Sequence, residues 1–343
     1  VSHDGEAIYG AQVIAAMEAQ AFVESDLDRL IDTAVALIPK DSIIYRMIAD
    51  IREWRERESD WRKARELLAA EYGYDKYGGN CHIVPNHGLI ILSLLYSEDS
   101  FQKSQMIVNT AGWDTDCNAA NVGCIMGIKN GLEGIDAGAD FRTPVADRLY
   151  IPTADGGRAI SDAVIETYHI VNIGRALAGL DPVAPKDGAR FHFNLPGAVQ
   201  GFVPEDSSEV QGTTKVYNVE GYSREGTRSL AIEYNHVAPG RPARAATATF
   251  VPESAIEMPG YQLLASPTLY PSQQVKARIV ADEQITGEAT CQLYIRVYND
   301  QDRLTPVYGP AVHLIPGVEH EFQWTIPDTG GYPIAEIGVE VSS

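Results

Sequence analysis

Two aspartates separated by one residue, Asp114 and Asp116, are the feature of the sequence with the clearest chemical meaning. They lie in the stretch NTAGWDTDCN at residues 109–118, shortly after Gly112. Two carboxylates on one turn can face a single hard cation such as Mg²⁺, Mn²⁺ or Ca²⁺, because these ions prefer oxygen ligands. Such a cation lowers the pKa of bound water and can orient a diol or a phosphate. A D-x-D pattern alone is common, and it fits equally well a helix N-cap followed by a solvated aspartate.

Two predicted helices must position this turn. One covers residues 101–108 and the other residues 118–130. The second helix has small residues at every fourth position, which are Ala119, Gly123 and Gly127, and these allow a neighbouring helix to pack closely. The pattern therefore predicts a tight turn that presents both aspartates near a helix N-terminus in a crowded interior.

At these residues the sequence resembles the ADP-ribosylglycohydrolase family, also called the DraG-like family. The metal motif of that family is a glycine-rich turn, G-x-D-x-D-(T/S)-N, followed by a helix of small residues. The segment GWDTDCN at residues 112–118 fits this motif closely. Residues 1–10 resemble a mid-domain element of the family that opens a helix. Residues 74–77 and 81–86 resemble the loop and helix start that precede the metal motif.

The resemblance implies an all-α domain with a centre of two Mg²⁺ or Mn²⁺ ions that binds the ribose diol of an ADP-ribosyl group. Water then displaces the group at the anomeric carbon and breaks an N- or O-glycosidic bond. By position in the motif, Asp114 and Asp116 are metal ligands, and Asp116 is the candidate for a bridging role. Cys117 stands where the family usually has Thr or Ser, whose hydroxyl is a ligand. Because a thiol is a poor ligand for Mg²⁺, either one metal is coordinated differently or the second site is weakened.

Six residues are candidates for contacts with the substrate, and each has a structural alternative. Ser2 and His3 belong to the N-terminal element and could contact the adenosine or phosphate part of a ligand, or Ser2 could simply cap a helix beside an exposed His3. His82 and Asn86 lie with His87 in a polar segment that is predicted to be a loop, and this loop could line a pocket or cap a following helix. The last two are Gly112 and Trp113 in the turn, where Trp113 could stack on a base or a ribose, or pack in the core. His82 and His87 have no third His or Cys at metal spacing, so this pair does not predict a zinc site.

The other metal ligands of the family, a (T/S)-D-D run, and its acidic residue near the substrate belong to the N-terminal half of the domain. The sequence contains no such run. Since Val1 falls inside the domain of the family, we expect the catalytic acid upstream of Val1 or on an N-terminal fragment of the same protein. Without that half, the chain is expected to be inactive alone.

The composition excludes several classes of partner. The 343 residues include 47 acidic and 27 basic side chains, which give a formal charge of −20. This balance argues against nucleic acids and anionic membranes, because both bind basic surfaces. The longest apolar run, residues 88–96, is shorter than the about 18–20 residues of a membrane span. Four cysteines without a CxxC pair indicate reduced thiols and favour a cytoplasmic protein, with Cys124 and Cys291 expected to be small buried side chains.

The hydrophobic patterns predict two domains of different classes. Residues 1–182 are predicted to be helical and to form the C-terminal portion of an ADP-ribosylglycohydrolase-like domain, with Ser25 and Ser161 as N-caps of two of its helices. Residues 183–190 are predicted to be a linker. Residues 191–343 alternate between polar and apolar side chains, which is typical of an antiparallel β-sandwich of the jelly-roll type.

The predicted sandwich resembles the carbohydrate-binding modules attached to glycosidases. Tyr294, Arg296 and Tyr298 alternate with apolar residues, so they fall on one face of a predicted strand. They could form a platform for a sugar or a partner, or cover the hydrophobic edges of the sandwich. The sequence as a whole predicts a metal-dependent glycohydrolase. The alternatives are a non-catalytic protein that binds ADP-ribose or carbohydrate, and a structural, crystallin-like use of the fold.

Overall fold

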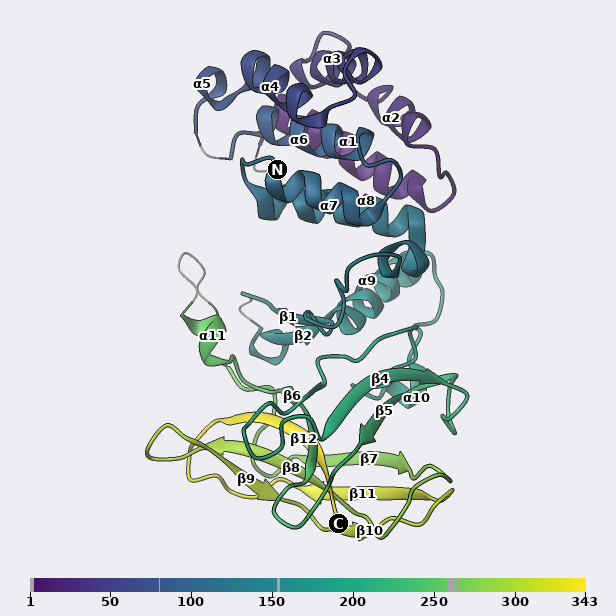
Figure 1. Cartoon of the computed structure of the whole chain (residues 1–343), viewed down its shortest axis with the longest axis vertical. Coiled ribbons are helices and arrows are strands. Elements are labelled where there is room, and N and C mark those ends of the chain that lie inside the picture. The colour runs from purple at the N-terminus through teal and green to yellow at the C-terminus, as the bar shows by residue number, and fades with distance from the viewer. Residues whose placement is uncertain (1–2, 80, 153–154, 258–262, 264–265) are drawn as a thin grey trace. The chain divides into compact units, whose positions relative to one another are not determined.

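The computed structural model describes residues 3–79, 81–152, 155–257, 263 and 266–343 (Figure 1). The chain divides by internal contacts into two compact units, Val1–Phe141 and Arg142–Ser343. The predicted fold class, a helical part followed by an antiparallel β-sandwich, is confirmed. Ser2, a predicted substrate contact, lies outside the described residues.

The N-terminal unit consists of helices and their connections in the residues that the structure describes. Its helices are α1 (Glu6–Ala21), α2 (Leu27–Val35), α3 (Ile43–Arg57), α4 (Trp61–Tyr72), α5 (Tyr74–Tyr77), α6 (Ile83–Leu95), α7 (Phe101–Thr110) and α8 (Thr115–Asp136). Every residue of α6 from Val84 to Leu95 is buried, and this helix packs against α1, α3, α4, α7 and α8. A helix that is apolar on all sides is stable only in an interior, so α6 forms the centre of the unit.

Two predicted helix caps are wrong, and both are displaced by one residue. Asp26 rather than Ser25 caps α2, because its carboxylate accepts hydrogen bonds from the backbone of the first turn at 2.9 and 3.2 Å. Asp162 rather than Ser161 caps the helix α9 (Ala163–Leu177) in the same way, with two contacts of 2.9 Å. The Ser161 hydroxyl instead contacts Glu166 at 2.7 Å. A carboxylate also interacts favourably with the positive end of the helix dipole, which a serine does only weakly.

The small residues of α8 have the predicted effect. A Cβ atom added at Gly123 would lie 3.0 Å from Nε2 of Gln105 on α7. The same Gln105 amide donates a hydrogen bond to the backbone oxygen of Ala119 at 3.1 Å. Because a side chain at Gly123 would push this amide away, the glycine allows α7 and α8 to pack at this distance. The close packing fixes the two ends of the turn that joins them.

All strands among the described residues lie in the C-terminal unit. Its strands and helices are β1 (Arg148–Tyr150), β2 (Ile160–Asp162), α9, α10 (Pro185–Gly188), β3 (Val203–Pro204), β4 (Thr214–Glu220), β5 (Arg228–Tyr234), β6 (Ala243–Ala248), α11 (Glu253–Ile256), β7 (Gln274–Val280), β8 (Thr290–Tyr298), β9 (Leu304–Tyr308), β10 (Val312–His313), β11 (Glu319–Thr325) and β12 (Ile334–Ser342). The largest sheet has the order β10-β8-β12-β6-β3, and β9 also pairs with β8. The pairs β11–β7 and β4–β5 form separate sheets, and every pairing is antiparallel.

One hydrophobic core joins two of these sheets. Alternate residues of β8, such as Cys291 and Ile295, are fully buried on the inner face of the large sheet. Phe322 and Trp324 of β11 belong to the same core cluster, although they come from the β11–β7 pair. Two antiparallel sheets that share one core form a β-sandwich.

The boundary between the two units lies between Phe141 and Arg142, whereas the sequence predicted a linker at residues 183–190. Hydrogen bonds connect the start of the second unit to its later residues. The Asp147 carboxylate accepts from the backbone of Val199 and Gln200 at 2.6 and 2.8 Å. The segment that was predicted to be helical also contains the short antiparallel pair β1–β2. No helix among the described residues is long and apolar enough to span a membrane.

Candidate metal centre

The turn between α7 and α8 has an unusual backbone. Gly112, Trp113 and Asp114 follow one another with φ angles of 76°, 62° and 47°, all in the left-handed region. Glycine adopts this conformation freely, but each of the two other residues pays about 1–3 kcal/mol for it. Surrounding contacts must therefore hold the turn in place.

Three side chains from other parts of the helical unit supply those contacts. The Arg65 guanidinium donates from Nε to the Ala111 backbone oxygen at 3.0 Å and lies 4.3 Å from the ring centroid of Trp113. The Tyr74 ring packs against the same indole, with centroids 5.1 Å apart. The buried Asn118 amide donates to the Trp113 backbone oxygen at 2.8 Å. Trp113 is thus clamped on its ring and on its backbone.

A chain of polar side chains orients the Asp114 carboxylate. The Tyr74 hydroxyl donates to Oδ1 of Asn86, and Nδ2 of Asn86 donates to Oδ2 of Asp114 at 2.9 Å. Asn86 is only 6% exposed, so its amide has a fixed position on α6. Burial, and the nearby charge of Asp114, raise the pKa of the Tyr74 hydroxyl, which keeps it a hydrogen-bond donor. The predicted residues Asn86 and Asp114 therefore do lie together.

Three of the predicted residues form a compact group of possible metal ligands. One ligand atom each from Asp114, Asp116 and Cys117 lies within 4.8 Å of the other two. Asp114 is half-buried, whereas Asp116 and Cys117 are exposed. In the part of the chain that the structure describes, no other set of three His, Cys, Asp or Glu side chains has this spacing. The group is open to solvent on one side and anchored to α6 on the other.

The structure places one further thiol near this turn, that of Cys81. It directly precedes His82, the N-cap of α6, and the Asp114 carboxylate is close enough to affect its pKa. Desolvation, and then the negative charge of Asp114, raise the pKa of both the Cys81 and the Cys117 thiol. The one feature of the sequence that pointed to Cys81 was its position at the start of the 81–86 segment, which resembles the family. The proximity of Cys81 to Asp114 depends on the packing of α6 against α8.

The predicted polar loop at residues 82–87 is wrong, because α6 already begins at Ile83. Pro85 sits in the first turn of this helix, where its missing N–H costs nothing. His82 has a capping role, since its Nδ1 accepts a hydrogen bond from the Val84 backbone at 3.2 Å. His87 is fully buried and lies on another side of α6, close to Gly10 of α1. His3 is exposed.

The four cysteines are free thiols. Cys291 is buried, as predicted, but Cys124 is exposed and the prediction of a buried side chain there is wrong. Partial burial and the neighbouring Glu18 carboxylate raise the pKa of Cys124 to about 11.

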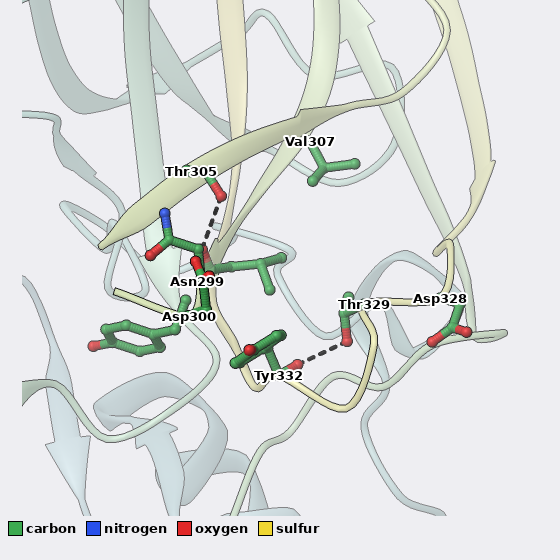
Figure 2. A pocket seen from close by; sticks show the side chains of 9 residues that line it. Asn299, Asp300, Thr305, Val307, Asp328, Thr329 and Tyr332 are labelled. Carbon is green, nitrogen blue, oxygen red and sulfur yellow. Dashed lines mark hydrogen bonds between the residues drawn. The ribbon is translucent and has the colours of Figure 1, made fainter. Parts of the chain in front are cut away.

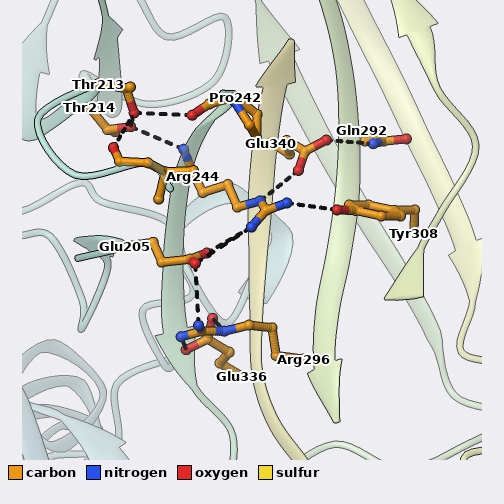
Figure 3. Close-up of polar contacts among 11 residues, drawn as sticks. Glu205, Thr213, Thr214, Pro242, Arg244, Gln292, Arg296, Tyr308, Glu336 and Glu340 are labelled. Atoms are coloured by element: carbon orange, nitrogen blue, oxygen red, sulfur yellow. Dashed lines mark hydrogen bonds and ion pairs between the residues drawn. The ribbon is translucent and has the colours of Figure 1, made fainter. Parts of the chain in front are cut away.

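In the β-rich unit, the predicted platform on β8 is largely closed. Tyr294 is fully buried, and Arg296 is paired with Glu336 and lies 3.4 Å from a Glu205 oxygen. Figure 3 shows Arg244 next to these residues, between Glu205 and Glu340, with nitrogen–oxygen distances of 3.4 and 2.6 Å. The arginines and glutamates pair with one another and cover the buried Tyr294, whose hydroxyl has no hydrogen-bond partner among the described residues. This face of β8 is therefore not an open surface for ligands.

The third residue of that platform, Tyr298, lines a pocket of about 440 Å³ at the end of β8 (Figure 2). The pocket lies between the β8–β9 connection and the loop that precedes β12. Its lining combines aromatic rings with amide, hydroxyl and carboxylate groups, and consists of Val297, Tyr298, Asn299, Asp300, Thr305, Val307, Asp328, Thr329 and Tyr332. The Thr329 hydroxyl donates to the Tyr332 backbone oxygen at 2.7 Å and fixes the loop.

Comparison with solved structures finds carbohydrate-binding modules among the matches. The CBM22-1–GH10 modules of Clostridium thermocellum xylanase 10B, complexed with xylohexaose, match 42% of this chain with 14% identity and a TM-score of 0.29. The CBM22-1 xylan-binding domain of Paenibacillus barcinonensis Xyn10C matches 44% with 8% identity and a TM-score of 0.31. The match covers 23% of the first of these chains and 86% of the second. The tandem CBM22 domain of the same Xyn10C is covered over 39% of its length, with 12% identity and a TM-score of 0.28 over 43% of this chain.

No curated protein matches the sequence. A family model does match, and it extends from the N-terminal helix through the Asp114 turn and into α9. The resemblance that the GWDTDCN segment predicts is thereby confirmed: residues 1–167 match the ADP-ribosylglycohydrolase family.

Proposed function

We propose that the Asp114 turn binds divalent cations and that the helical part of the protein hydrolyses a glycosidic bond at the anomeric carbon of an ADP-ribosyl or related N-riboside group. The observation that carries this proposal is the gathering of Asp114, Asp116 and Cys117 within 4.8 Å, in the segment that resembles the metal motif of the family. The family match over residues 1–167 supports glycohydrolase activity.

The donor set suits a divalent cation. Two carboxylates are suitable ligands for Mg²⁺ or Mn²⁺, whereas the thiol of Cys117 is suited to softer ions. A bound cation would supply Lewis-acid stabilisation and orient the ribose hydroxyls. The chain contributes the positioning: Asn86 and Tyr74 hold the Asp114 carboxylate, and the clamped Trp113 fixes the backbone that carries it. Because Asp116 and Cys117 are exposed, the open side of the group is accessible to a ligand.

The double variant D114N/D116N tests the metal site. We expect it to lower the affinity for Mn²⁺ by at least about 100-fold, because it removes two charged ligands, and even partners of ligands contribute 10–100-fold. The measurement is a Mn²⁺ titration followed by electron paramagnetic resonance of the free ion. E133Q serves as the matched control, since it neutralises an exposed carboxylate elsewhere on α8. Equal affinities of the double variant and the control would contradict the assignment.

Activity is tested with an ADP-ribosylated acceptor in the presence of Mg²⁺ or Mn²⁺. We expect release of ADP-ribose when a (T/S)-D-D run is supplied to the unmodified chain, and none when D114N/D116N replaces it. Because the sequence has no (T/S)-D-D run, the assay is carried out with the chain alone and with an N-terminal fragment of the same protein that supplies one. Binding of ADP-ribose without hydrolysis in both conditions would favour a binding protein instead.

For the β-rich unit, we infer a second function, the binding of a saccharide in the pocket of Figure 2. The specific observation is that two tyrosines, Tyr298 and Tyr332, share this pocket with the side chains of Asn299, Asp300 and Asp328. Sugars present apolar ring faces that pack on aromatic rings and hydroxyls that need hydrogen-bond partners. Tyr332 is 42% exposed, so its ring is available for such a contact.

The variant Tyr332→Ala is expected to weaken saccharide binding about tenfold, which corresponds to about 1.4 kcal/mol for one lost aromatic contact. Calorimetric titration of the full chain with xylohexaose measures this effect. Tyr222→Ala, at an exposed tyrosine away from the pocket lining, is the control and should leave the affinity unchanged. The inference is wrong if xylohexaose and other oligosaccharides of similar length do not bind, or if both variants bind equally well.

A further inference from the structure

We propose that the pocket of Figure 2 selects saccharides by charge: it favours sugars that carry free amino groups and disfavours sugars that carry carboxylate groups. This inference rests on the proposed saccharide site and names the class of saccharide that the site takes. The residues to which we assign the selection are Asp300 and Asp328. The inference concerns the β-rich unit alone and is independent of the proposed metal site.

The charges in the pocket lining are all negative. Among the nine lining residues, Asp300 and Asp328 carry charge, and no Lys, Arg or His of the described chain lines the pocket. Both aspartates are exposed, and neither forms an ion pair with a described residue. Figure 2 shows them on either side of Tyr332, the ring on which a sugar is expected to pack. A cleft lined by charges of one sign attracts ligands of the opposite sign and repels those of its own.

The basic side chains that are closest along the chain do not cancel these charges. Arg296 of β8 pairs with Glu336 through two nitrogen–oxygen contacts of 2.5 and 2.9 Å. Arg303 belongs to the β8–β9 connection, but it is not part of the pocket lining, and Asp302 beside it carries the opposite charge. The pocket therefore keeps its negative charge in the folded protein.

Several neutral polar groups of the lining are already used within the protein. The Thr305 hydroxyl donates to the Val297 backbone oxygen at 3.2 Å, and the Thr329 hydroxyl donates to the Tyr332 backbone oxygen. Oδ1 of Asn299 accepts from two backbone N–H groups at 2.9 and 3.0 Å. These groups hold the loops around the pocket in place, so much of the hydrogen bonding to a ligand falls to the carboxylates.

The two carboxylates need a ligand that is rich in donors. Oδ1 of Asp328 accepts from the Gly330 backbone at 3.0 Å. Because an ionised carboxylate has about four lone-pair sites, it can accept further hydrogen bonds, but it cannot donate any. A protonated amino group of a sugar brings several N–H donors together with a positive charge, and charge-assisted hydrogen bonds are the stronger ones. A uronic acid instead brings a further carboxylate, which Asp300 and Asp328 repel.

Calorimetric titration of the full chain with three hexasaccharides measures the selection. The probes are xylohexaose, which is neutral, a hexamer of β-1,4-linked glucosamine, which is cationic at about pH 6, and a hexamer of galacturonic acid, which is anionic. Each exposed ion pair contributes up to about a fivefold gain in affinity, so two should make the glucosamine hexamer bind about tenfold more tightly than xylohexaose. The galacturonic acid hexamer should bind about tenfold more weakly than xylohexaose. Added salt should reduce both differences, because it screens exposed charges.

The double variant D300N/D328N removes the charge of both side chains and nearly keeps their size. We expect the affinities for the charged hexamers, each divided by the affinity for xylohexaose, to approach one. This ratio cancels any change in hydrogen bonding that affects all three sugars. D206N/D282N is the matched control, since it also removes two exposed carboxylates of the β-rich unit, but neither of them lines the pocket. The control should keep the selection, which separates the effect of the pocket from the general charge of −20.

The outcomes separate this inference from the proposed saccharide site. If none of the three hexamers binds, both are wrong. If the unmodified chain binds all three equally well and Tyr332→Ala weakens each of them, the saccharide site stands and the selection by charge is wrong. A preference for the glucosamine hexamer that persists in D300N/D328N, or that is lost to the same extent in D206N/D282N, would overturn the role of the two pocket aspartates.

Discussion

Arg244→Met is expected to lower the free energy of unfolding of the β-rich unit by about 3–5 kcal/mol, because it leaves buried carboxylates without their partner. The Arg244 side chain is 9% exposed, and it contacts Glu340 at 2.6 Å and Glu205 at 3.4 Å, which are 6% and 4% exposed (Figure 3). Arg296 remains near Glu205 in the variant, but Glu340 loses the charged partner in contact with it and keeps the hydrogen bond from the neutral amide of Gln292. An ion that stays buried without its partner retains its full desolvation cost.

Chemical denaturation of the full chain, followed by the circular dichroism of the β-sheet, measures this loss. Arg278→Met is the matched control, since Arg278 also contacts two glutamates, Glu225 and Glu321, but all three side chains are at least 45% exposed. We expect a change of at most about 1 kcal/mol there. The double variant R244M/E340Q should recover part of the lost stability, because it removes the charge that Arg244→Met leaves unpaired. Equal effects of Arg244→Met and Arg278→Met would contradict the prediction.

The stability of the helical unit is expected to fall as the pH decreases from about 6.5 to about 4, and His87 is the cause. Burial lowers the pKa of His87 from its ordinary 6.5 to about 4. Neither ring nitrogen has a hydrogen-bond partner among the described residues. Between these two pH values the unfolded chain binds a proton that the folded chain does not, so the proton favours unfolding. A pKa shift of this size lowers the free energy of unfolding by about 3 kcal/mol at the acidic end of the range.

His87→Leu should remove this dependence, because leucine has a similar volume and does not titrate. It should also raise the stability at neutral pH by about 1 kcal/mol or more, since it eliminates buried polar atoms without partners. The measurement compares urea denaturation of the wild-type protein and the variant at pH 7 and pH 4.5. The difference between the two proteins cancels the titration of all other groups. A constant difference at both pH values would show that His87 is accessible to protons in the folded state.

Local sequence patterns predicted most of the secondary structure because they report local interactions. The helix predicted at residues 101–108 corresponds to α7, and alternation predicted the strand that forms β8. The errors occur where the decisive interaction is not local. The polar side chains within residues 82–87 suggested a loop. In the structure His82 is the N-cap of α6 and residues 83–87 form its first turns. The helix begins this early because the whole segment is buried in the centre of the unit. Cys124 was expected to be buried, yet it lies on an exposed part of α8.

In the second unit, too, sequence patterns did not predict features that depend on contacts between distant residues. Alternation assigned Tyr294, Arg296 and Tyr298 to one face of β8, which the structure confirms. Whether that face is open depends on the chain segments that cover it, and no pattern within the strand contains this information. Glu205, far away in the sequence, closes the face by pairing with Arg244 and Arg296. The pocket beside Tyr298 likewise requires the loop of Tyr332, which only folding brings there.

The sequence by itself determined the motif: Asp114 and Asp116 in a glycine turn, before a helix of small residues, are specific enough to predict the family match over residues 1–167. Spacing along one chain segment suffices there, because all the predicted ligands lie within a few residues of one another. Only the tertiary structure decided the surroundings of this turn. The packing of α6 against α8 brings the Asn86 amide to the Asp114 carboxylate, and contacts between distant segments follow from how cores are filled rather than from local spacing.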